Sequence, residues 1–117
     1  MFNLLILTDG GGRIGFGHLV RCLAIKDAWK HGAHLLAHME DDVAPSDGVE
    51  IFDWLNQPEK LTQFSSENTI VLVDSYRPSK NYFLLLKGLF KFVVVLDDYN
   101  RITYPVDLVI CPGIYGE

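Results

Sequence analysis

A run of glycines that ends in a histidine is the part of the sequence best suited to chemistry. Residues 10–18 read GGGRIGFGH and contain five glycines in nine positions. Glycine allows positive φ angles and a close approach of the backbone to a ligand. Exposed N–H groups at the start of a following helix favour anionic or electron-rich groups. We therefore interpret Gly12, Gly15 and Gly17 as substrate-binding positions, with a tight strand-to-helix turn as the alternative.

His18 closes this loop and lies in the first turn of the helix predicted to follow it. The positive end of the helix dipole disfavours an imidazolium ion there, so we expect a neutral ring at about pH 7. A neutral imidazole can take a proton from water, which makes His18 a candidate general base. A purely structural histidine is the alternative.

Two familiar phosphate-binding loops can be tested against the glycine run. The dinucleotide fingerprint with Gly15 and Gly17 as its first two glycines needs a third at position 20, where Val20 stands. A Walker loop needs lysine and then serine or threonine after Gly17, but His18 and Leu19 follow. Both patterns fail at the residues that carry their chemistry, and we expect no cofactor.

Further polar side chains follow the predicted strands, namely Asp9, Asp74, Tyr76, Asp97 and Asp98. In an open parallel sheet, ligands bind outside the carboxyl ends of the strands, so these side chains are expected at the binding edge. Several carboxylates would repel a phosphate held nearby. Asp74 and Asp97 are therefore predicted to bind the hydroxyl and amide groups of a sugar, whereas capping a turn is an equally good interpretation of Asp98.

Three further histidines, His31, His34 and His38, are close together in sequence. His34 and His38 would share one face of a strand, but His31 belongs to the end of a helix. No carboxylate is placed to complete a set of ligands, so we expect no metal site.

The elements that position these residues are short apolar runs alternating with helical patterns, which is typical of βαβ units on a parallel sheet. The runs predict strands at Asn3–Leu7, His34–Met39, Thr69–Val73, Phe90–Leu96 and Leu108–Cys111. Helical spacing predicts a helix over Gly17–His31, stopped by Gly32, and a short one from Pro58 to about Ser66.

Two segments need other signals than apolar periodicity. Ser79 can cap a helix whose apolar residues run through Tyr82–Leu86, with Gly88 as its terminator. The segment Val49–Asn56 is ambiguous between strand and helix, and we favour a short strand.

Composition limits the classes of protein to consider. A chain of 117 residues with 49% hydrophobic and 21% charged residues is expected to fold as one domain. Its net charge of -5 offers no basic field for nucleic acid. The apolar stretch Tyr82–Leu96 is interrupted by Lys87 and Lys91, and the first residues lack the pattern of a signal peptide, so we expect a cytoplasmic protein outside the membrane. Cys22 and Cys111 are expected to be buried as small apolar residues.

Three motifs together carry a resemblance to a known family: GGGRIGFGHLVRCLAI, VLVDSYRPSKNYF and VVVLDDYNRITYPVDLVICPG. They resemble the amino-terminal lobe of the UDP-sugar hydrolase of pseudaminic acid biosynthesis and of related spore-coat polysaccharide glycosyltransferase-like proteins. The similarity covers most of the chain outside about residues 40–67, and IGxGHxxRC is its specific element.

This resemblance implies the amino-terminal half of a glycosyltransferase-B fold, with residues 1–117 as one Rossmann-like lobe. It implies inverting release of UDP from a 2,4-diacetamido-2,4,6-trideoxy sugar without a metal. The catalytic histidine of the family then corresponds to His18, its active-site tyrosine to Tyr76, and an acidic position in its first loop to Asp9.

The family's second, nucleotide-gripping lobe has no counterpart in the sequence up to Glu117. We therefore expect activity only when a complementary lobe or a second copy completes the site. A catalytically silent sugar-binding lobe is one alternative. A receiver-like signalling domain with Asp74 as phosphoacceptor is another, but Asp9 stands without an acidic neighbour and Cys111 precedes a proline where lysine is needed.

Overall fold

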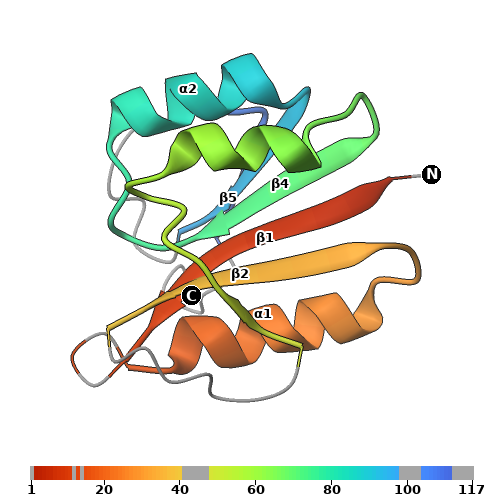
Figure 1. Cartoon of the computed structure of the whole chain (residues 1–117). Helices are drawn as coiled ribbons and strands as arrows, with labels where there is room; N and C mark the ends of the chain where they lie inside the picture. Colours follow the sequence, from red (N-terminus) through yellow and green to blue (C-terminus); the bar gives the residue numbers. More distant parts are fainter. Residues whose placement is uncertain (1, 12, 14, 41–47, 98–103, 112–117) are drawn as a thin grey trace.

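The computed structural model describes residues 2–11, 13, 15–40, 48–97 and 104–111 as strands, helices and the loops that join them (Figure 1). The strands are β1 (Asn3–Gly10), β2 (Ala33–Met39), β3 (Glu50–Ile51), β4 (Thr69–Asp74), β5 (Phe92–Leu96) and β6 (Leu108–Ile110). The helices are α1 (Gly17–Ala28), the 3-10 helix η1 (Pro58–Phe64) and α2 (Lys80–Leu89).

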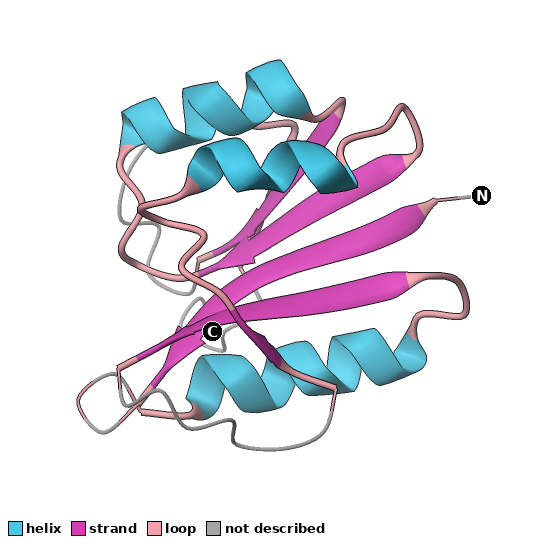
Figure 2. Cartoon of the chain, in the orientation of Figure 1, coloured by secondary structure: helices cyan, strands magenta, loops and turns pink. Residues whose placement is uncertain are grey.

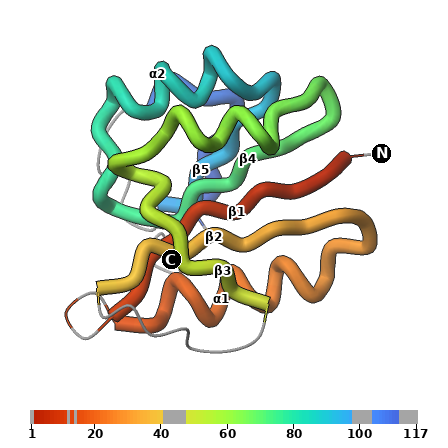
Figure 3. Tube along the Cα trace, viewed as in Figure 1, coloured from red at the N-terminus to blue at the C-terminus, as the bar shows by residue number. Residues whose placement is uncertain are grey.

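All six strands pair in parallel in the order β3-β2-β1-β4-β5-β6. Figure 3 follows the chain outward from β1 through α1 and β2 to β3, then back across the sheet to β4. The direction of winding therefore reverses between β1 and β4, where Leu7 pairs with Val73 and Thr8 with Asp74. This arrangement confirms the predicted fold class, and it creates the switch point at which open α/β sheets bind ligands.

The helices divide between the two faces of the sheet, with α1 on one face and η1 and α2 on the other (Figure 2). Because successive strand residues point to opposite faces, each strand supplies both layers. Leu4 and Ile6 pack with Leu19 and Cys22 of α1, whereas Leu5 belongs to the opposite layer. Parallel sheets are covered on both faces in this way, which explains the nearly continuous apolar runs of β1 and β4.

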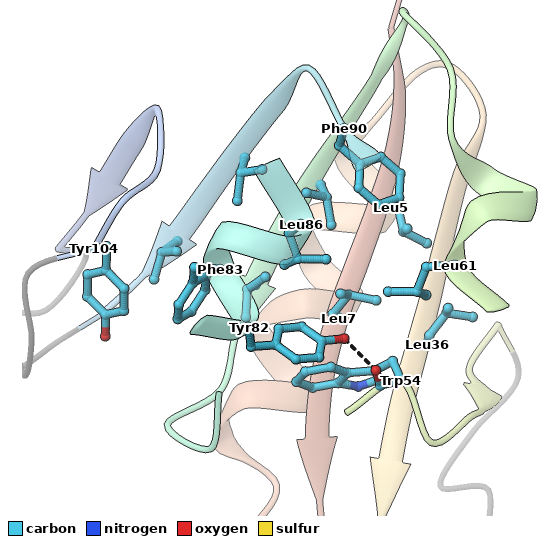
Figure 4. Packing of buried hydrophobic residues seen from close by; sticks show 14 residues of the cluster. Leu5, Leu7, Leu36, Trp54, Leu61, Tyr82, Phe83, Leu86, Phe90 and Tyr104 are labelled. Atoms are coloured by element: carbon cyan, nitrogen blue, oxygen red, sulfur yellow. Dashed lines mark hydrogen bonds between the residues drawn. The ribbon is translucent and has the colours of Figure 1, made fainter. Parts of the chain in front are cut away.

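A buried tryptophan ties the second layer to the carboxyl end of β1 (Figure 4). Trp54 is fully buried, and its indole Nε1 donates a hydrogen bond to the backbone oxygen of Thr8 at 2.8 Å. The Tyr82 hydroxyl of α2 donates to the Trp54 carbonyl, drawn as the dashed line in Figure 4. The segment between β3 and η1 thus links β1 to α2 through Trp54 and Tyr82.

The amino-terminal half departs from the sequence prediction at two boundaries. β1 continues to Gly10, three residues beyond the predicted end, because residues 8–10 still pair with β2 and Thr8 also pairs with β4. α1 ends at Ala28, three residues before the predicted end. Trp29 leaves the helix with an extended backbone, and its indole Nε1 donates to the Phe2 carbonyl at 3.0 Å.

In the carboxy-terminal half, Ser79 caps α2 as predicted, since its side chain accepts a hydrogen bond from the Tyr82 backbone N–H. Gly88 lies inside α2 instead of ending it, and the helix continues to Leu89. The short strand favoured in residues 49–56 is the two-residue β3. Cys22 is buried as expected, but the same prediction was wrong for Cys111, which is exposed.

No helix in the part of the chain that the structure describes is both long and apolar enough to span a membrane.

The packing of α2 gives the first prediction. Leu86 is fully buried against the sheet, whereas 53% of Leu84 on the same helix is exposed. Leu86→Ala should lower the free energy of unfolding in urea by about 2–5 kcal/mol, because it removes buried methyl groups and leaves a cavity. Leu84→Ala makes the same chemical change at the surface and should stay within about 0.5 kcal/mol of wild type. Equal losses for the two variants would show that α2 does not pack as described.

Candidate active site at the carboxyl ends of β1 and β4

The candidate site lies at the switch point of the sheet, where β1 and β4 end next to one another toward the left of Figure 1. The hydroxyl Oγ1 of Thr8 donates to the backbone oxygen of Asp74 at 2.9 Å and joins the two strand ends. Asp9 follows Thr8 in β1, and Asp74 is the last residue of β4. Both carboxyl groups are buried almost completely.

The Asp74 carboxylate accepts hydrogen bonds from three residues of α1. His18 Nδ1 lies 2.7 Å from Oδ1, and Arg21 contacts Oδ2 through Nε at 2.5 Å and Oδ1 through Nη2 at 2.6 Å. The Cys22 thiol lies 3.4 Å from Oδ2. Residues at i, i+3 and i+4 share one face of a helix, so this spacing brings all three donors to one carboxylate.

These donors determine the charge of Asp74. Burial alone raises the pKa of a carboxyl group, and it is the largest single influence on Asp74. The hydrogen bonds and charges of Arg21 and His18 together outweigh it, so the pKa of Asp74 lies below its ordinary value. Asp74 is therefore an anion that is fully enclosed by the fold.

Asp74 in turn determines the protonation of His18. Its hydrogen bond is the largest cause that raises the pKa of His18, while burial acts in the opposite direction. The helix dipole was expected to disfavour the imidazolium ion, but the surroundings of His18 favour it and raise its pKa. A full negative charge in contact with Nδ1 exceeds the partial positive charge at a helix start.

The same contact fixes which ring nitrogen is available. An ionised carboxylate can only accept, so His18 Nδ1 must carry a hydrogen toward Asp74. In the neutral ring, Nε2 is then left with a lone pair, and 15% of the side chain is exposed. The geometry is that of a histidine oriented by an acid, with its second nitrogen able to accept a proton.

Tyr76 is the predicted site residue that the structure places beside His18. The two rings meet edge to face, with centroids 5.0 Å apart and planes 86° apart. This contact restricts the rotation of the imidazole ring. Tyr76 itself is half-buried, so part of its ring also lies at the surface.

Asp9 occupies a different environment from Asp74. Ser75 Oγ donates to its Oδ2 at 2.5 Å, and Arg77 Nε lies 3.9 Å from the same oxygen. Its Oδ1 is buried without a hydrogen-bond partner among the residues described. Burial is the main reason that the pKa of Asp9 is raised, so two carboxyl groups on adjacent strands have pKa values displaced in opposite directions.

The histidine-rich segment does not gather around a metal site. Arg77 Nη1 lies 2.5 Å from His38 Nδ1, and because a guanidinium only donates, the His38 proton must sit on Nε2 toward Asp53 Oδ1 at 3.5 Å. His34 lies at the other end of β2, 3.7 Å from Glu50. Among the described residues, no three histidine, cysteine or acidic side chains are grouped as metal ligands.

The glycine loop closes on itself. Backbone hydrogen bonds join Gly11 and Gly15 in both directions, at 3.2 and 2.7 Å. Both have positive φ, and a Cβ on Gly11 would lie 2.6 Å from Glu40, so glycine is required there. A Cβ on Gly17 would meet nothing within 4 Å, which leaves the start of α1 open. Gly12 lies outside the described residues.

Asp97 is buried directly after β5. The Tyr104 hydroxyl donates to its carboxylate, and its backbone N–H donates to the Ile110 oxygen at 2.9 Å. Tyr104 packs against Phe83 in the layer beneath α2. These contacts give Asp97 a structural setting, while its assignment to substrate binding stays a prediction.

Two residues of this edge, Arg21 and Arg77, were missed as site residues. Arg21 follows His18 by three positions in a predicted helix, and that spacing was a usable signal. Arg77 follows Asp74 at the carboxyl end of β4, where site residues are expected.

Two cavities lie at the opposite edge of the sheet. One of about 300 Å³ is lined by Asn3, His34 and Thr69 among others, and one of about 400 Å³ lies between the ends of η1 and α2. Both are at the amino ends of the strands, away from the edge at which parallel sheets bind their ligands. The cluster around Asp74 is therefore the better candidate for chemistry.

Comparisons of the chain with protein-family models, with curated proteins and with solved structures found no match.

The His18 contact predicts a pH dependence of stability. Because its pKa is higher in the folded chain, the His18–Asp74 pair stabilises the fold below the unfolded pKa of histidine, about 6.5. This stabilisation is lost as the pH rises through the folded pKa, while Asp74 stays ionised. The difference in free energy of unfolding between wild type and His18→Asn should therefore be larger at about pH 6 than at about pH 9.

His31→Asn is the matched control, because it replaces an exposed histidine beyond the end of α1. The measurement is the free energy of unfolding in urea at both pH values. If His18→Asn is less stable than wild type by the same amount at both, the described contact is contradicted.

Proposed function

We propose that this lobe supplies the catalytic base of a nucleotide-sugar hydrolase or of a related glycosyltransferase. The observation that carries the proposal is the 2.7 Å contact between His18 Nδ1 and Asp74, at the switch point of the sheet. It supplies a histidine that is held by an acid and can accept a proton at Nε2. The UDP-sugar substrate and inversion at the anomeric carbon follow from the resemblance of the sequence.

In the proposed step, His18 Nε2 removes a proton from water as the water oxygen forms a bond to the anomeric carbon. The bond from that carbon to the diphosphate oxygen breaks, and its electron pair leaves with UDP. Diphosphate is a good leaving group and needs little help from an acid. Asp74 stabilises the imidazolium that results, because it is anionic and in direct contact with the ring.

Other groups at this edge suit a sugar. The start of α1 has neither a side-chain cap nor an acidic residue in its first turn, so its N–H groups can donate to sugar oxygens. The absence of a side chain at Gly15 and Gly17 permits close approach. Tyr76 would orient the sugar or the water through its hydroxyl. Asp9, on the adjacent strand, would be the acidic group of the first loop that the resemblance implies.

We infer that the diphosphate is held from the other side, by a complementary lobe or a second copy of the chain. This division follows from the resemblance, in which the second lobe grips the nucleotide. In this arrangement the sugar lies against the described lobe and UDP against its partner. Transfer to an acceptor hydroxyl instead of water would use the same base.

A silent sugar-binding lobe is the second candidate, and the raised pKa of His18 favours it, because the ring is then in its neutral, proton-accepting form over a narrower range of pH. The receiver-like alternative is disfavoured by the contacts of Asp74. Its carboxylate is fully buried and accepts bonds from His18, Arg21 and Cys22, so it is not placed to accept a phosphoryl group.

Catalysis by His18 can be tested in the enzyme completed by its natural second lobe. His18→Asn should lower the release of UDP from the diacetamido-trideoxy sugar nucleotide by about 10²-fold or more, the usual scale for loss of a general base. Tyr76→Phe should cost less, because the base remains. His34→Asn, at the opposite edge of the sheet, is the control and should keep wild-type turnover. Near-normal turnover of His18→Asn would leave the silent lobe as the better account.

The 117-residue chain alone tests whether the sugar binds to this lobe and UDP to its partner. We expect it to bind the diacetamido sugar weakly and to release no UDP above the buffer blank, because one lobe offers an open edge instead of a cleft. Sugar titration followed by NMR should move the amide signals of residues 15–18 and of Tyr76. Rapid UDP release by the chain alone, lost in His18→Asn, would show that no second lobe is needed. Signal changes confined to the opposite edge would contradict the placement of the sugar.

A further inference from the structure

Arg21 forms the most extensive contact in the candidate site, although its side chain is 29% exposed. Its Nε and Nη2 reach different oxygens of Asp74, at 2.5 and 2.6 Å. Such a two-point contact between a guanidinium and a carboxylate fixes the plane of the carboxylate as well as its position. A single-point donor would leave the carboxylate free to rotate about its Cβ–Cγ bond.

The orientation of Asp74 matters for His18, because His18 and Arg21 donate to the same carboxylate oxygen. Asp74 Oδ1 accepts from both His18 Nδ1 and Arg21 Nη2. Arg21 therefore determines where the acceptor of His18 lies, from a position one turn further along the same helix. The Cys22 thiol donates to the other oxygen, Oδ2. It stays neutral, because burial raises its pKa.

Arg21 also brings a positive charge into direct contact with the Asp74 carboxylate, next to His18. Two acids act on His18, Asp74 from β4 and Asp9 from β1, and both favour its protonated form. The aromatic ring of Tyr76 meets the His18 ring edge to face. The positive charge of Arg21 acts against the acids and favours the neutral ring.

We propose that Arg21 is a positioning residue, which orients the Asp74 carboxylate toward His18 and offsets part of its charge, so that the imidazole can be neutral and take a proton from water. The role in catalysis rests on the function proposed above. The coupling among Arg21, Asp74 and His18 is a property of the folded chain and is measurable without turnover.

The test is an NMR titration of the histidine ring signals in the 117-residue chain, with the His18 signal assigned by its loss in His18→Asn. Arg21→Gln should raise the titration midpoint of His18, because the carboxylate is no longer offset by a cation. Arg21→Lys retains the charge and should return the midpoint toward wild type. Lys26→Gln removes one positive charge from the last turn of the same helix and measures the effect of net charge alone.

An Arg21→Gln midpoint that is lowered, or that moves no more than in Lys26→Gln, overturns the proposal. So does an Arg21→Lys midpoint displaced as far as that of Arg21→Gln, which would rule out the charge effect, or one equal to that of wild type, which would rule out the orienting effect.

A second comparison covers the chance that Arg21→Gln does not fold, since it leaves Asp74 buried without a strong partner. The double variant Arg21→Gln/Asp74→Asn removes both charges, and its His18 midpoint should lie only slightly above that of Asp74→Asn alone, because the direct effect of the Arg21 charge on the ring is smaller than that of either acid. A shift as large as the one that separates Asp74→Asn from wild type shows that Arg21 acts on His18 mainly without Asp74, which contradicts the proposed route. Because neither comparison uses substrate, failure of the positioning role is distinct from failure of the proposed hydrolase activity.

Discussion

The carboxylate of Asp74 is a negative charge that the fold encloses completely, and the arrangement of the site depends on satisfying it. An enclosed carboxylate costs several kcal/mol unless it is paired and hydrogen-bonded. Its partners here are His18, Arg21 and Cys22, all on the inner face of α1. The loop between β1 and α1 must therefore deliver the helix with this face toward β4. The glycine loop and the bond from Thr8 to the Asp74 backbone serve that requirement.

The two strands at the switch point carry carboxyl groups with different properties. Asp74 faces the cations of α1 and has a lowered pKa, whereas Asp9 is buried beside Ser75 and has a raised pKa. Environments that displace the pKa values of neighbouring acids in opposite directions are a common feature of acid–base sites. Asp74 is thereby suited to stabilising a cationic histidine, while Asp9 is suited to holding a proton at its own carboxyl group.

The sequence predicts the parallel sheet well, because the buried runs of β1, β4 and β5 are short, apolar and separated by helical patterns. The sequence prediction fails where a contact between residues far apart in the chain determines the local structure. α1 ends early because the Trp29 indole bonds to the Phe2 carbonyl, a contact between residues far apart in the chain. The protonation of His18 was predicted from its own helix, but it is determined by Asp74, 56 positions away. The motif HxxRC was recognised as specific, yet its physical meaning appears only when β4 supplies the carboxylate that its three donors share.

The central claim is that Asp74 holds the His18 ring by Nδ1 and leaves Nε2 to accept a proton. The most direct measurement is the ¹⁵N chemical shift of both ring nitrogens of His18, recorded above its titration midpoint so that the ring is neutral. We predict that Nδ1 carries the hydrogen and that Nε2 shows the shift of a bare, unprotonated nitrogen. A neutral ring with its hydrogen on Nε2 would contradict the claim, because His18 could then neither donate to Asp74 nor present a base to the substrate.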